Sequence, residues 1–136
     1  MNSRGTLIRL KKFHVDERRR KLAQIKAVVA EFENMAVDLD REVQAEQDRA
    51  GIHDPAHFAY PTYAKAVMTR RENLKRSAAE LQGQLDDAQA ALGEAFEELK
   101  KVELLDERNH IREQAVDSAR EQAELDQIGH GREAPD

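Results

Sequence analysis

The sequence has no cysteine and no tryptophan, and it contains only three prolines, two tyrosines and four phenylalanines in 136 residues. The absence of cysteine excludes disulfides, thiolate metal sites and cysteine nucleophiles, and it fits a reducing compartment. No apolar run approaches the roughly 18 residues that a membrane helix needs. The N-terminus also lacks the hydrophobic core of a signal peptide. We therefore expect a cytoplasmic protein.

Large apolar side chains are scarce as well, because 20 of the hydrophobic residues are alanine. A thick three-dimensional core is excluded at this composition. Charged residues make up 36% of the chain. Enrichment in Ala, Glu, Lys, Leu and Arg, combined with apolar periodicity, is typical of long helices and coiled coils. The predicted fold class is all-α.

Charge is segregated along the chain, although the net charge is only -5. Residues 1–26 hold nine basic and two acidic side chains, a net charge of +7, whereas residues 77–136 carry a net charge of -10. The basic run at 18–21 could neutralise nucleic-acid phosphates, but the overall acidity and the lack of base-stacking aromatic residues nearby argue against that partner. Two interpretations stay open: a surface for a protein partner, or a solvated face that pairs with acidic residues of a second helix, namely Asp86, Asp87 and Glu94.

One break interrupts the helical pattern. Gly51 is a suitable C-cap for a first helix, and Pro61 fits the first turn of a second helix but not its interior. Asp54 and Pro55 could cap a short helical turn at 55–59 within the loop. The sequence thus predicts a single domain over residues 1–136, with a helix at 6–50, a tip loop at 51–61, a second helix at 62–128 and a disordered tail at 129–136.

Residues on both predicted helices alternate at spacings of three and four, which is the repeat of a coiled-coil seam. The seam of the first helix consists of Leu22, Ile25, Val29, Phe32, Ala36, Leu39 and Val43, and the register below continues it at Val15 and Ile8. The seam of the second helix, with one basic interruption, consists of Tyr60, Ala64, Val67, Arg71, Leu74, Ala78, Leu81, Leu85, Ala88, Leu92, Ala95, Leu99 and Val102. If the chain folds back at the tip loop, opposed residues share a constant index sum. A sum of 110 aligns the two seams, with Ile25 opposite Leu85 and Ala36 opposite Leu74. The prediction is a long antiparallel two-helix coiled-coil hairpin. Beyond Val102 the first helix has no further residues to pair with the second, so the second helix continues as a C-terminal overhang.

Two surfaces of this hairpin are candidates for partner binding. The overhang carries a rough apolar stripe that lacks an intramolecular partner, and we expect an external one to cover it; its residues are Ile111, Ala115, Val116, Ala119, Ala123, Leu125 and Ile128. The tip carries Phe58, Tyr60 and Tyr63, and exposed aromatic clusters are typical interface anchors. The alternative for the tip is that Phe58 and Tyr60 pack back onto the helices.

Catalytic and metal-binding patterns are scarce. His53, Asp54 and His57 could supply metal ligands, but a polar loop in which Asp54 caps a turn is the favoured interpretation. No carboxylate pair is recognisable as an acid and base, because a two-helix ribbon has no desolvated pocket that would shift a pKa. We expect no enzyme activity, metal or cofactor. A dimeric helical enzyme using Arg18 or Lys11 against an anion is a minor alternative, and it would show a buried arginine cluster at its dimer interface.

Three segments carry a resemblance to a known family. They read TLIRLKKFHVDERRR at 6–20, DPAHFAYPTYAK at 54–65 and AFEELKKVELLD at 95–106. Together they resemble the flagellar type III export protein FliJ, of alphaproteobacterial type, over nearly the whole chain. The resemblance implies an antiparallel coiled coil similar to the gamma stalk of rotary ATPases.

The resemblance also implies a function and a set of partners. It implies a non-enzymatic stalk or adaptor that couples the export ATPase hexamer to the cytoplasmic domain of the membrane export gate and escorts export chaperones. Such a protein lies in the cytoplasm, peripheral to the inner membrane at the flagellar base, and has no cofactor or small-molecule substrate. Both helix ends would enter the ATPase pore, which makes the candidate ATPase-binding residues Arg4, Lys11, Lys12, Leu105, Ile111, Val116, Ala119 and Ile128. The remaining alternative is a generic coiled-coil scaffold or a helical protein that binds nucleic acid through its basic face.

Overall fold

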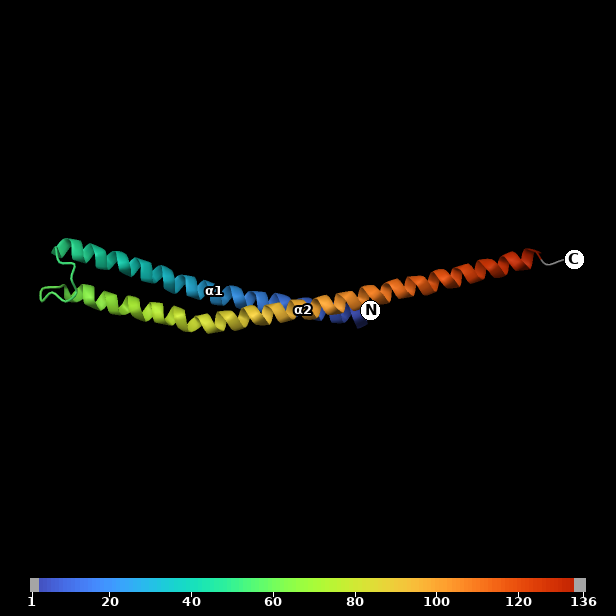
Figure 1. The fold of residues 1–136 in the computed structure, drawn as a ribbon, viewed down its shortest axis with the longest axis horizontal. Helices are drawn as coiled ribbons and strands as arrows, with labels where there is room; N and C mark the ends of the chain where they lie inside the picture. The colour runs from blue at the N-terminus through green and yellow to red at the C-terminus, as the bar shows by residue number, and fades with distance from the viewer. Residues whose placement is uncertain (1–2, 134–136) are drawn as a thin grey trace. The chain divides into compact units, whose positions relative to one another are not determined.

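The computed structural model describes residues 3–133 of the chain, with side chains described up to residue 129. Two α-helices, α1 (Ser3–Ala50) and α2 (Thr62–Glu133), are joined by a loop over residues 51–61. The helices pack antiparallel as a helical hairpin (Figure 1), which confirms the predicted all-α fold. Neither helix contains, within these residues, a stretch that is long and apolar enough to cross a membrane.

Both helices extend further than the sequence predicts. Helix α1 begins at Ser3, where the prediction places its start at residue 6. The predicted disordered tail at 129–136 is helical up to Glu133, and residues 134–136 lie outside the described part of the chain. The physical reason is that no proline follows Pro61 until residue 135, and a helical glycine costs only about 1 kcal/mol. Gly129 and Gly131 are therefore tolerated.

The chain divides into two compact units, each built from a segment of α1 and a segment of α2. Unit 2 comprises Val15–Glu94 and contains the tip loop, and unit 1 comprises Met1–His14 together with Ala95–Asp136. The expectation of a single domain over the whole chain stays a prediction.

Unit 2 is held together by the predicted seam. Every predicted seam position on its two helical segments is buried or half-buried, while the positions between them are mostly exposed. The buried residues of this unit are Val15, Leu22, Ala36, Tyr60, Ala64, Val67, Ala78 and Ala88. Half of them are alanine, so the two backbones approach closely and the apolar layer is thin.

The register of unit 2 agrees with the predicted index sum of 110. Arg71 occupies a seam position opposite Leu39, and its guanidinium forms an ion pair with the adjacent Asp40. Near the tip, the side-chain amide of Gln47 donates a hydrogen bond of 2.8 Å to the hydroxyl of Tyr60. The Arg71 contact joins residues far apart in sequence across the seam, so it fixes the axial position of one helical segment against the other, whereas the Gln47 contact ties the end of α1 to the tip loop.

Unit 1 continues the same repeat with more polar seam positions. Ala95 is buried, and Ile8, Leu99 and Val102 are half-buried. The Nε atom of Arg4 lies 3.7 Å from Asp106 Oδ1, at the predicted index sum. Pairing therefore extends past Val102, where the prediction ends it, because the additional turn of α1 from Ser3 brings Arg4 into contact with α2.

The far part of α2 in unit 1 has no such cover. Every described side chain from residue 111 to residue 128 is exposed to solvent. The seam positions that would continue the repeat are polar, at Asp106, Asn109 and Glu113. A segment with this pattern gains little from packing against another seam, so the predicted overhang corresponds to this exposed stretch of helix.

Candidate partner-binding surfaces

The tip loop is shaped by a glycine cap and a series of short-range hydrogen bonds. Gly51 has φ of 73° and its amide donates to the carbonyl of Gln47 at 2.8 Å, which is the αL cap that a glycine favours. The carboxylate of Asp54 accepts a hydrogen bond of 2.9 Å from the backbone amide of Ala56. The ring Nδ1 of His57 accepts a hydrogen bond of 3.0 Å from the backbone amide of Ala59. Residues 55–59 form turns and not the short helix that Asp54 and Pro55 suggested.

The three aromatic residues at the tip fall into two groups. Tyr60 is 5% exposed, and its hydroxyl accepts from Gln47 and donates to the sulfur of Met68 at 3.5 Å. Phe58 is 96% exposed and stacks on the ring of His57 with centroids 4.7 Å apart. Tyr63 is also exposed. Tyr60 is therefore a core residue of unit 2, as the alternative interpretation proposed, but the same interpretation is wrong for Phe58, which does not pack back onto the helices. Phe58 and Tyr63 are the aromatic side chains that a partner could reach.

The histidines of the tip have other interactions than metal binding. His53 Nε2 lies 3.0 Å from Asp48 Oδ1, and this hydrogen bond, together with one from Gln44, holds the pKa of Asp48 below its ordinary value. Within the described residues, no group of three or more His, Cys, Asp or Glu side chains is arranged to hold a metal ion.

The candidate residues at the paired end of unit 1 are largely occupied by ion pairs within the unit. Arg4 Nη2 donates to Glu113 Oε1 at 2.6 Å in addition to its contact with Asp106. Lys11 Nζ donates to Glu98 Oε2 at 2.8 Å, and this hydrogen bond and the lysine charge lower the pKa of Glu98. Lys12 lies on an exposed position of the same helix.

The apolar candidates of α2 are accessible. At least half of the side chain is exposed in Leu105, Ile111, Val116 and Ile128, and Ala119 is exposed as well. No described contact joins them to α1. The structure thus leaves these side chains free for another molecule.

Sequence analysis missed a further set of exposed apolar side chains in unit 1. The set lies outside the seam positions and includes Leu7, Leu10, Phe13 and Leu104. These residues could have been identified from the sequence, because they are large and apolar but stand at positions that the repeat assigns to the solvent-exposed face.

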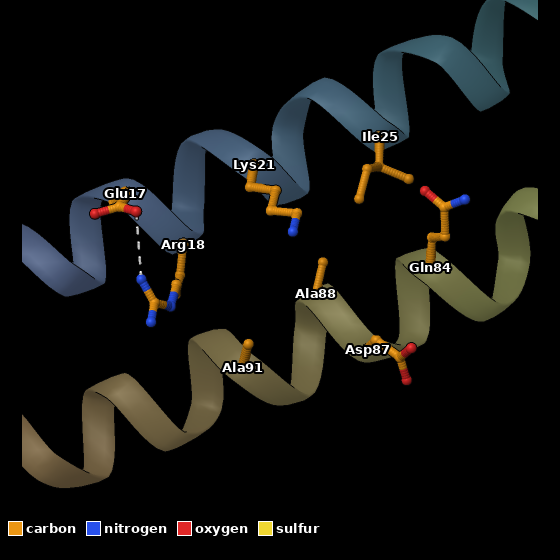
Figure 2. A pocket seen from close by; sticks show the side chains of 8 residues that line it. All are labelled: Glu17, Arg18, Lys21, Ile25, Gln84, Asp87, Ala88 and Ala91. Carbon is orange, nitrogen blue, oxygen red and sulfur yellow. Dashed lines mark ion pairs between the residues drawn. The ribbon is translucent and has the colours of Figure 1, made fainter.

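A hollow of about 700 Å³ lies between the two helices of unit 2 (Figure 2). Helix α1 lines it with Glu17, Arg18, Lys21 and Ile25, and α2 lines it with Gln84, Asp87, Ala88 and Ala91. Figure 2 shows the side chains of Lys21, Ala88 and Ala91 between the two ribbons. One of the two interpretations left open for the basic run paired it with acidic residues of the second helix; Arg18 instead pairs with Glu17 on its own helix at 3.5 Å. Arg19 likewise pairs with Asp16 at 3.7 Å.

Comparison with known proteins identifies the family. Residues 5–130 match the family model described as FliJ, flagellar FliJ protein. The chain belongs to the FliJ family. No curated protein and no solved structure matches it.

Membership of the FliJ family fixes the broad role of the chain. It is a non-enzymatic, coiled-coil component of the flagellar export apparatus, which is a type III secretion system. Family membership implies partners within the flagellar export apparatus.

Proposed function

We propose that this FliJ-family chain, of alphaproteobacterial type, is a stalk or adaptor that couples the export ATPase hexamer to the cytoplasmic domain of the membrane export gate. In this proposal it works in the cytoplasm at the flagellar base, peripheral to the inner membrane, and also escorts export chaperones. The observation that carries the proposal is the exposed segment of α2 at 111–128, whose apolar side chains lack a partner within the described chain.

The two ends of the molecule receive different partners in this proposal. The ATPase binds the exposed α2 segment through Leu105, Ile111, Val116, Ala119 and Ile128, together with Lys12 on α1. Arg4 and Lys11 support this end indirectly, because their charges are already engaged by carboxylates of α2. The export gate is met by the body of the hairpin and by Phe58 and Tyr63 at the tip.

Truncation after Asp106 tests the ATPase contact. The hairpin should stay folded, with a melting temperature close to that of the full chain, because the removed segment buries little apolar surface. Stimulation of the export ATPase and swimming motility should both be lost. Retained stimulation by the truncated chain would overturn the assignment of this segment.

Amide exchange gives a second measurement on the full-length protein. A highly charged isolated helix is marginally stable in water, so the amides of 111–128 should exchange rapidly in the free chain. They should become protected when the ATPase is added. As a matched control, Phe58→Ala at the tip should leave both the protection and the stimulation of ATP hydrolysis unchanged, since the tip contacts a different partner.

A further inference from the structure

Four basic residues occupy positions in the coiled-coil seam, where an apolar residue would be expected. Each places a charged head beside a thin apolar layer, so a nearby carboxylate of the opposite helix lowers the cost of that placement. Three of the four have such a carboxylate; the pairs are Arg4 with Asp106, Lys11 with Glu98 and Arg71 with Asp40.

Arg18 is the exception. It faces Leu92 in the predicted register, and among the described residues its ion pair is with Glu17, its neighbour in sequence, at 3.5 Å. Lys21, one turn further along α1, forms no ion pair with any described residue. Arg18 at the seam and Lys21 on the exposed flank beside it therefore lack an ion pair with any described acid of α2.

These two cations line the hollow between the helices. Ile25, Ala88 and Ala91 supply apolar atoms, and the alanines leave the space open because their side chains are short. A volume of about 700 Å³ falls within the range of protein sites that accept a ligand or a side chain of a partner. The hollow thus combines an apolar surface with two cations that lack a counterion from the opposite helix.

We propose that this hollow docks an acidic helix of a partner protein, with one carboxylate placed between Arg18 and Lys21. The partner supplies the acid that α2 supplies at the other three basic seam positions. Charge complementarity with the basic segment of α1 attracts such a helix. Glu17 and Asp87 also line the hollow, so they repel a continuous polyanion and favour a helix with a single inserted carboxylate over nucleic acid. This proposal concerns unit 2 and does not depend on coupling to the ATPase.

A pair of helical peptides tests the proposal with the full-length chain. The probe is a fluorescent, stapled peptide of Ala and Glu, and its control replaces every Glu by Gln. Fluorescence anisotropy should show that the Glu peptide binds at least about tenfold more tightly, a difference of about 1.4 kcal/mol. Failure of the Glu peptide to bind more tightly than the Gln peptide would overturn the proposal.

Variants of the chain locate the contact. Arg18→Gln with Lys21→Gln should weaken binding of the Glu peptide by about tenfold. The matched control is Arg19→Gln with Lys26→Gln, which removes the same charge from the same helix but alters no residue that lines the hollow. The control should stay within about threefold of the unmodified chain. Equal losses in the two variants would mean diffuse attraction and would overturn a specific site.

A charge-neutral variant tests the hollow itself. Ala91→Leu fills the space from α2 and should weaken binding of the Glu peptide by about tenfold while helicity, measured by circular dichroism, is unchanged. Unchanged binding by this variant would show that the peptide does not enter the hollow. A DNA duplex that competes fully with the peptide and binds with a steep salt dependence would assign the basic segment to nucleic acid and overturn the proposal.

Discussion

The thin seam of unit 2 makes the cost of a single core truncation calculable. Val67 is 2% exposed and is the most deeply buried large side chain, whereas Val37, on α1 in the same unit, is 47% exposed. Replacing valine by alanine removes the same atoms at both positions. The two variants Val67→Ala and Val37→Ala therefore differ in burial and not in chemistry.

The magnitude follows from the area that each substitution removes from the apolar layer. Losing two buried carbons costs about 1.6 kcal/mol at Val67 and about half of that at Val37. Alanine has a higher helix propensity than valine, which raises the free energy of unfolding by about 0.6 kcal/mol in both variants. Val67→Ala should lose about 1 kcal/mol of unfolding free energy or more, because a cavity adds to the transfer cost. Val37→Ala should change it by less than about 0.5 kcal/mol.

The assay is urea unfolding of the full chain, followed by circular dichroism at the helical minimum. The m-value should be the same in both variants, so that the midpoints report stability directly. If the two substitutions lower the unfolding free energy equally, burial in the seam does not determine stability, and the assignment of Val67 to the core of unit 2 is wrong.

Three further predictions concern register, the tip and pH. Cysteine pairs at positions 25 and 85, or at 36 and 74, should form disulfides within one chain on a non-reducing gel, and crosslinking only between chains would contradict the antiparallel register. Gly51→Ala should lower the unfolding free energy by about 1 kcal/mol because φ is positive at this residue. Gly83→Ala, in the interior of α2 with open space around it, should raise the unfolding free energy by a similar amount. A change of the same sign in both variants would refute the role of Gly51 as a helix cap. The pKa of Glu98 is lowered in the folded chain, so its pairing with Lys11 contributes stability above the ordinary pKa of 4.5, and this stability is lost as the pH falls through the folded value. Glu98→Gln should therefore flatten the pH dependence of the melting temperature in this acidic range more than Glu97→Gln does. Equal profiles for the two variants would show that the Lys11 contact is not formed in solution.

The periodicity of the sequence was sufficient to predict the fold because a two-helix seam is specified by local spacing. Val15, Leu22, Ala36 and Val67 are buried where the repeat places them, and the contact of Arg4 with Asp106 falls on the predicted index sum. A seam of this kind needs no long-range information beyond the position of one turn, which Gly51 and Pro61 mark.

The candidate surfaces were harder to predict, since exposure depends on side-chain direction. Phe58 and Tyr60 are two residues apart in a loop, yet one is exposed and the other is buried with its hydroxyl bonded to Gln47. Similarly, charge counting suggested that Arg18 would pair with α2, but a guanidinium binds the nearest carboxylate it can reach, which is Glu17. The hollow beside it arises from the small volume of Ala88 and Ala91, which no charge pattern reports.

The ion pair between Lys11 and Glu98 has a mechanical consequence. A seam with a strict seven-residue repeat is nearly degenerate under translation, because sliding one helix by a heptad returns apolar residues to apolar positions. Lys11 makes the two shifts unequal to the observed register: one replaces Glu98 by Ala91 and sets the ammonium opposite Leu92, and the other replaces Glu98 by Leu105 and sets the ammonium opposite Asp106. This exposed contact adds little to the free energy of folding, so its consequence is a preference for one axial alignment of the two helices over alignments shifted by a heptad.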